Sequence, residues 1–144
     1  MVMRALRLIL LWLAIVVIFA LYGWFRYNFE LAVAFGAIGI GAASCIVAGL
    51  IVIGEVRSRR LARGEAVLLL LASSVLGTIL PAVVLHAVEF ATRPPVEPLE
   101  AALTGVHLFQ GERGVWLVLA PFCTVWIALL VFVTFVVCVF SVKR

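Results

Sequence analysis

EVRSRRLARGE, residues 55–65, is the one dense run of charge in a chain of 144 residues. It contains four arginines and two glutamates, and it separates two halves that are almost entirely apolar. Each half holds two long apolar segments. Because arginines beside membrane spans determine on which side of the membrane a loop stays, this run decides how the two halves are arranged.

The composition excludes an ordinary soluble domain. Hydrophobic residues make up 67% of the chain and charged residues 12%, whereas soluble domains carry about 25% charged residues. A globule of this length buries only about two-thirds of its surface, so it could not hide this much apolar area from water. We therefore predict an all-α integral membrane protein, because helices satisfy their own backbone hydrogen bonds in lipid.

Four segments are long and apolar enough to cross a bilayer, which needs about twenty residues. They predict a four-transmembrane-helix bundle, built as two hairpins in a single domain over residues 1–144. The basic loop 55–65 joins the hairpins, and an external loop covers 91–114. In the external loop, apolar residues at three- and four-residue spacing predict a short amphipathic helix over 99–109. The predicted transmembrane helices cover residues 5–25, 31–54, 66–90 and 115–142.

The first segment could also be a secretory signal peptide, because Arg4 and Arg7 precede its apolar run. No small-x-small cleavage site follows, and the aromatic residues around Trp24 extend the segment to spanning length. We therefore favour a retained helix whose aromatic end lies at the membrane interface.

The second segment is rich in small residues, which recur at three- and four-residue spacing on two faces of the predicted helix. Such residues let helix backbones approach closely in lipid, so they predict a central helix packed by several neighbours. The alternative is a glycine-lined conduit, in which only Ser44 would hold water. The predicted packing residues are Gly36, Gly39, Gly41, Cys45 and Gly49.

The third segment carries most of the polar residues inside the predicted spans. Pro81 lacks a backbone N–H, so a bend is expected there, and nearby hydroxyl groups can satisfy the carbonyls that it frees. The alternative is that these polar side chains form a path for an ion or a substrate. The residues of this possible path are Ser73, Ser74, Thr78, His86 and Glu89.

His86 is the one candidate cofactor ligand in the spans. Ala82 lies four residues before it, and a small residue at this spacing leaves room for a haem or chlorin ring. A haem held by two histidines needs a second one at the same depth, and His107 falls in the external loop. The sequence contains no phosphate-binding loop, zinc-ligand spacing or serine–histidine–acid set, so we predict that the protein is not an enzyme.

Lysine and arginine are divided unevenly between the two sides of the predicted membrane. The positive-inside bias makes the richer side cytoplasmic, which puts both termini and residues 55–65 in the cytoplasm. Abundant alanine, valine and arginine favour a bacterial source, hence the inner membrane. We also expect the connector to attract anionic lipid head groups, and its terminal glutamates to pair with its arginines. The poorer side has Arg26, Arg93 and Arg113; the richer side has Arg4, Arg7, Arg57, Arg59, Arg60, Arg63, Lys143 and Arg144.

The leading hypothesis is a non-catalytic subunit or accessory (scaffold) protein of a larger inner-membrane complex for electron transfer, transport or the envelope. It depends on the small-residue second helix and on a fourth helix that is apolar on every side. Its partners would be membrane lipids and other integral membrane subunits, or further copies of the chain. We expect no nucleic-acid binding, because no basic face is interleaved with exposed aromatics. A small oligomeric channel or transporter is the alternative, and haem or chlorin binding through His86 is the third hypothesis.

Overall fold

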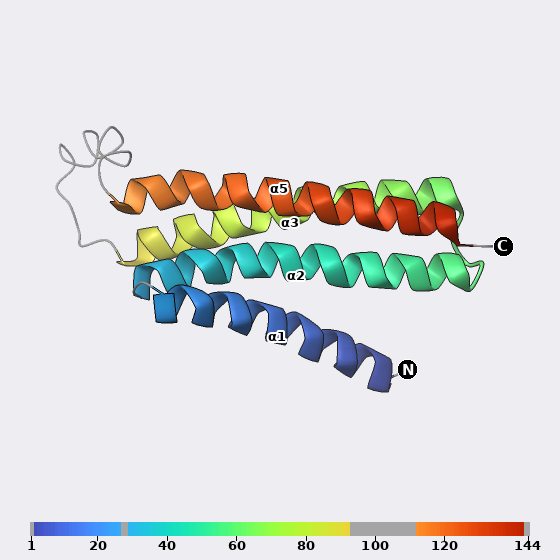
Figure 1. Cartoon of the computed structure of the whole chain (residues 1–144), viewed down its shortest axis with the longest axis horizontal. Coiled ribbons are helices and arrows are strands. Elements are labelled where there is room, and N and C mark those ends of the chain that lie inside the picture. The colour runs from blue at the N-terminus through green and yellow to red at the C-terminus, as the bar shows by residue number, and fades with distance from the viewer. Residues whose placement is uncertain (1, 27–28, 93–111, 143–144) are drawn as a thin grey trace.

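The computed structural model describes residues 2–26, 29–92 and 112–142, and every regular element in these ranges is an α-helix. The four long helices lie side by side (Figure 1). They are α1 (Val2–Arg26), α2 (Phe29–Arg57), α3 (Arg63–Thr92) and α5 (Glu112–Ser141).

Each of these four helices is long and apolar enough to cross a membrane. The prediction of an all-helical, multi-pass membrane protein is therefore confirmed. The amphipathic helix predicted over 99–109 lies outside the described residues. The apolar spans are Met3–Phe25, Ala32–Arg57, Arg63–Val88 and Leu119–Ser141.

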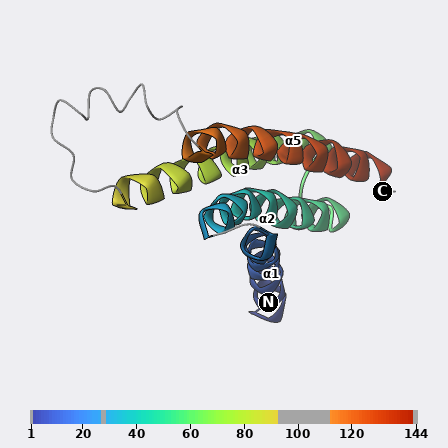
Figure 2. The same ribbon diagram turned by 60° about the vertical axis from the view of Figure 1, so that its left-hand side comes forward.

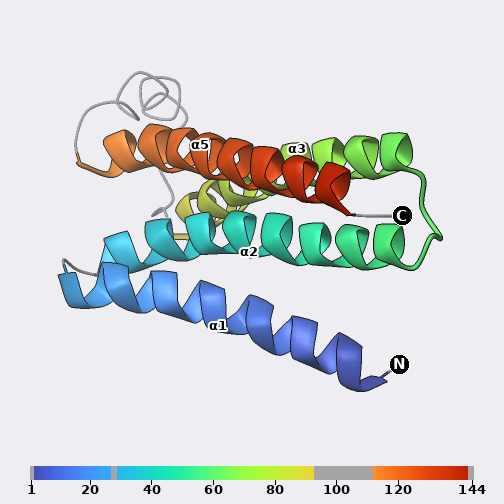
Figure 3. The same cartoon turned by 45° about the vertical axis from the view of Figure 1, so that its right-hand side comes forward.

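Helix α2 is the central helix. It packs against α1 on one side and against α3 and α5 on the other, and α3 and α5 also pack together (Figure 2). In the described residues α1 makes no comparable contact with α3 or α5. Its first turns diverge from α2, as Figures 1 and 3 show. In the most apolar stretch of each helix, 56% of α2 is buried inside the molecule but only 6% of α1.

The first turn of α1, the last turn of α5 and the connector between α2 and α3 lie at the same end of the molecule (Figure 1). This arrangement follows from antiparallel packing of consecutive helices. We call this end the connector end and the opposite one the far end.

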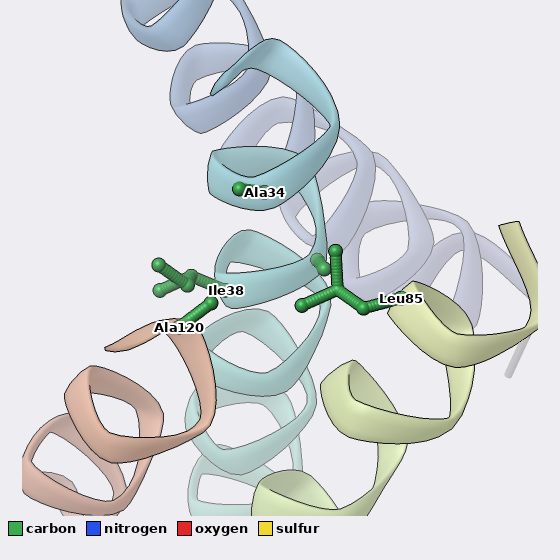
Figure 4. Packing of buried hydrophobic residues seen from close by; sticks show 5 residues of the cluster. Ala34, Ile38, Leu85 and Ala120 are labelled. Atoms are coloured by element: carbon green, nitrogen blue, oxygen red, sulfur yellow. The ribbon is translucent and has the colours of Figure 1, made fainter. Parts of the chain in front are cut away.

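The core of the α2–α3–α5 group consists of two clusters of small and branched apolar side chains. In the far-end cluster, Ala34 and Ile38 of α2 meet Leu85 of α3 and Ala120 of α5 (Figure 4). Small side chains at these contacts let the helix backbones approach closely. The connector-end cluster contains Val52, Val56, Ala66, Leu70 and Val139.

The connector is shorter than the predicted loop 55–65, because α2 continues to Arg57 and α3 begins at Arg63. Helix α2 ends in a Schellman motif, in which the Arg60 amide donates to the Glu55 carbonyl (3.0 Å) and the Arg59 amide to the Val56 carbonyl (3.1 Å). The charged residues at 55–57 and 63–65 therefore belong to helices. A helix can continue beyond the apolar layer of the membrane, where charged side chains are hydrated. Charged residues therefore do not by themselves mark the end of a helix.

Candidate functional site

Three helices meet at Gly41 of α2. A Cβ atom placed on Gly41 would meet the Gly77 carbonyl oxygen of α3, and would lie 2.7 Å from Pro81 Cγ and 2.8 Å from Thr124 Cγ2 of α5. A Cβ on Gly77 would in turn meet Cys45 Sγ and lie 3.2 Å from the Gly41 oxygen. The two glycines thus bring the backbones of α2 and α3 into direct contact.

The side chains around Gly41 satisfy their own polar atoms. Thr124 is completely buried, and its hydroxyl donates to the Ala120 carbonyl at 2.7 Å. The Cys45 thiol donates to the Ser73 carbonyl at 3.7 Å, the long distance typical of sulfur. One turn along α2 from Cys45 towards the connector end, a Cβ on Gly49 would meet the Phe135 ring of α5. This face of α2 is therefore a packing surface for α3 and α5.

The other small-residue face of α2 meets α1. A Cβ on Gly36 would lie 3.6 Å from Ala20 Cβ, and one on Gly39 would lie 2.9 Å from Phe19 Cβ. A polar contact adds to this interface: Trp12 Nε1 donates to Ser44 Oγ at 3.1 Å.

Trp12, which makes this polar contact between α1 and α2, was not singled out from the sequence. Ser44 Oγ itself donates to the Ile40 carbonyl at 2.7 Å, which leaves its lone pairs free to accept from Trp12. The signal in the sequence is a tryptophan in the middle of an apolar run. Its indole N–H needs a hydrogen-bond acceptor inside a membrane, which indicates a contact with a polar group of another helix.

The hydroxyl groups of the possible polar path bond to the backbone of their own helix. Ser73 and Ser74 both donate to the Leu70 carbonyl, at 2.9 and 2.8 Å, and Thr78 donates to the Val75 carbonyl at 2.7 Å. These bonds use the donors locally, and the structure brings none of the three hydroxyls together with His86. The side chain of Glu89 lies outside the described set, so a path along α3 stays a prediction.

His86 is exposed on α3, and its Nδ1 lies 2.8 Å from the Ala82 carbonyl oxygen. In the tautomer with Nδ1 protonated, this hydrogen bond leaves Nε2 as the ring atom available to a ligand. His107 falls outside the described residues, so a histidine pair stays a prediction. Within the described ranges no three histidine, cysteine, aspartate or glutamate side chains gather as a metal site.

The connector end concentrates the predicted head-group arginines. Arg63 Nη2 donates to the Val142 carbonyl at 2.9 Å, and its guanidinium lies 5.9 Å from the centre of the Phe140 ring. Its Nε atom is buried without a hydrogen-bond partner in the described part of the chain. The other three, Arg57, Arg59 and Arg60, are exposed.

The expected ion pairs between the connector's glutamates and arginines do not form among the described residues. The Glu65 carboxylate instead accepts from the Ala62 amide at 3.0 Å, which caps the first turn of α3. Glu55 contributes its backbone carbonyl, which accepts from the Arg60 amide and from the Ser58 hydroxyl. Helix-end hydrogen bonds therefore hold the connector, and Arg63 adds its bond to the Val142 carbonyl.

Comparisons of the chain with protein families, with curated proteins and with solved structures find no match. The candidate functional features of the described residues are the packing faces of α2 and the arginines at the connector end.

Proposed function

We propose that the protein is a non-catalytic subunit or accessory protein of a larger assembly in a bacterial inner membrane. The observation that carries this proposal is the position of α1, whose one extensive contact within the described residues is with α2. In a closed four-helix bundle each helix touches two neighbours. Here one side of α1 has no neighbour from this chain in the described residues, and a helix from another subunit would complete the bundle.

The outer surface of α1 supports this proposal. Its side chains include Ile18, which is 63% exposed, and Phe25, which is 82% exposed. Lipid can also cover such a surface. A partner helix is favoured over lipid only where it packs more closely against the apolar side chains. A partner helix would gain that packing on both α1 and the flank of α2.

The local bonding of the polar side chains also supports a structural role. Hydroxyl groups on α2, α3 and α5 donate to carbonyls of their own helices, as in Ser44, Ser74 and Thr124. Groups bonded in this way stabilise helices in lipid and leave no donor aimed at a substrate.

Co-purification tests the proposal. The full chain, extracted in a mild detergent, is expected to elute with other membrane proteins in a fixed ratio. An Ile18→Trp change on α1 should release those partners, whereas Leu76→Trp on α3, at a side chain of similar exposure (67%), should retain them. A particle that contains only this chain would contradict the proposal.

We further propose that the connector end faces the cytoplasm. The support is the number of arginines at this end, namely those of the connector and the first turns of α1 and α3.

A further inference from the structure

An amphiphilic cavity opens between α2 and α5 at the connector end. Its volume is about 410 Å³, and its lining residues come from the last turns of both helices. Arg57 is the last residue of the α2 span, and Ser141 is the last residue of the α5 span. The cavity therefore lies at the level where two membrane spans end. The lining residues are Ile53, Arg57, Cys138, Ser141 and Val142.

The polarity of the lining changes with depth. Ile53 and Cys138 lie one helical turn deeper in the span than Arg57 and Ser141, and they form an apolar floor. Among the lining side chains Arg57 is the charged donor. The Ser141 hydroxyl already donates to the Val137 carbonyl at 2.8 Å, so its proton is not available to a ligand.

We propose that this cavity binds the phosphate-bearing head of an anionic phospholipid. The guanidinium of Arg57 would hold the phosphate oxygens through paired N–H donors, the geometry for which arginine is suited. The apolar floor would receive the first carbons of an acyl chain. A lipid presents these two chemistries at the same boundary, whereas a soluble anion would leave the apolar floor unused.

The charges around the cavity favour an anion. Arg57 is exposed, and no carboxylate contacts it among the described residues. Arg63 donates to the carbonyl of Val142, which also lines the cavity, so a second guanidinium lies beside it. Basic residues near a membrane surface each strengthen the attraction to anionic lipid.

A second cavity, of about 550 Å³, is a weaker candidate for lipid. Its lining is Arg59, Arg60, Leu61 and Ala62, all on the connector and beyond the ends of the α2 span. Its lining carries positive charge but includes no apolar side chain from the end of the α2 or α5 span. Arg60 therefore provides a matched control: an exposed arginine of the same end that does not line the α2–α5 cavity.

Cysteine alkylation in the full-length, delipidated protein in non-ionic detergent measures occupancy. Cys138 lines the cavity, and the exposed Cys123 on the same helix lies outside its lining, so the ratio of their rates with N-ethylmaleimide isolates the cavity. Added phosphatidylglycerol is expected to slow alkylation of Cys138 and not of Cys123. Phosphatidylcholine, which carries no net charge, is expected to protect Cys138 only at much higher concentration.

Variants then test the role of Arg57. Arg57→Gln should require about tenfold more phosphatidylglycerol for the same protection, because a charge-assisted bidentate contact is lost. Arg60→Gln should leave the concentration nearly unchanged, and Arg57→Lys should fall between them. The buried Cys45 must stay unreactive in each variant, which shows that the helices remain packed.

Three results would overturn the proposal. Equal protection by phosphatidylcholine would mean that charge does not select the ligand. Equal losses in Arg57→Gln and Arg60→Gln would mean diffuse attraction to the whole connector. Protection by glycerol phosphate as strong as that by phosphatidylglycerol would assign the cavity to a soluble phosphate. None of these results bears on whether the chain has protein partners.

Discussion

Gly41 is the residue on which the packing of three helices depends. The Gly77 carbonyl lies against it, and this carbonyl is freed because Pro81, four residues later, has no amide proton to donate. A proline inside α3 and a glycine on α2 thus form one contact. Weak Cα–H···O interactions stabilise such glycine contacts between helices.

We expect Gly41→Ala to lower the free energy of unfolding by about 1–3 kcal/mol, the usual cost of overpacking a close contact. The added methyl would meet the Gly77 oxygen, a backbone atom that cannot move without shifting a helix. Titration of the protein in mixed micelles with a denaturing detergent, followed by circular dichroism, measures the change.

Gly64→Ala is the matched control, because a Cβ there meets nothing within 4 Å. It should be neutral or stabilising, by up to about 1 kcal/mol, since alanine favours a helix over glycine. Equal losses at both glycines would show that close packing at Gly41 is not the cause.

The hydrogen bond from Trp12 to Ser44 provides a second test at the same scale. A double-mutant cycle with Trp12→Phe and Ser44→Ala should give a coupling energy of about 0.6 kcal/mol, the average for such bonds between membrane helices. Trp12→Phe keeps the ring and removes the donor. A coupling energy near zero would contradict a direct contact between α1 and α2 at this position.

The connector between α2 and α3 includes one residue in an unfavourable backbone conformation. Arg59 has a φ of 59° and is the one non-glycine residue with positive φ in the described part of the chain. It occupies the C′ position of the Schellman motif, where glycine is the usual residue because a Cβ is unfavourable there. An arginine at this position keeps positive charge at the connector end.

Arg59→Gly should therefore raise the free energy of unfolding by about 1 kcal/mol, the left-handed penalty that glycine avoids. The matched control is Arg60→Gly, which removes the same charge from a neighbouring residue of ordinary φ and should be neutral or destabilising. Thermal unfolding of both variants in detergent measures the difference. Equal stabilisation by the two changes would point to relief of charge repulsion instead.

At the scale of the whole molecule, the proposed orientation makes a prediction about access. A single cysteine introduced at Ser58, in a chain without its native cysteines, should react with a membrane-impermeant maleimide only after the cells are opened. Ser58 is exposed on the connector, so its accessibility depends on the side of the membrane alone. Labelling of intact cells would reverse the orientation of all four spans.

The proposed partner subunit would supply α1 with a neighbour that the described part of this chain does not provide. In the described ranges α2 packs against helices on two sides, whereas the one extensive contact of α1 is with α2. Many large apolar side chains of α1, α3 and α5 are exposed on the surface of the molecule. A surface that binds a partner helix and a surface that faces lipid are both apolar. Close packing, and not hydrophobicity, would distinguish them.

The four long helices follow from the amino-acid sequence alone. Four apolar runs of membrane length must be helices, since lipid offers no partner for unpaired backbone groups, and hydropathy is enough to find them. The sequence also marked the small residues of the second helix. The residues that pack against these small residues could not be predicted from the sequence. The side chains of the four helices are nearly uniform in hydropathy, so hydropathy does not show which faces meet.

The surfaces that meet are known only from the folded molecule. It placed Gly41 against Gly77, Gly39 against Phe19, and Trp12 beside Ser44. It also gave α1 one extensive contact, with α2, in the described part of the chain, and it opened a cavity beside Arg57. Contacts of this kind depend on the shape of side chains and the direction of each helix, and these properties arise when the chain packs in three dimensions.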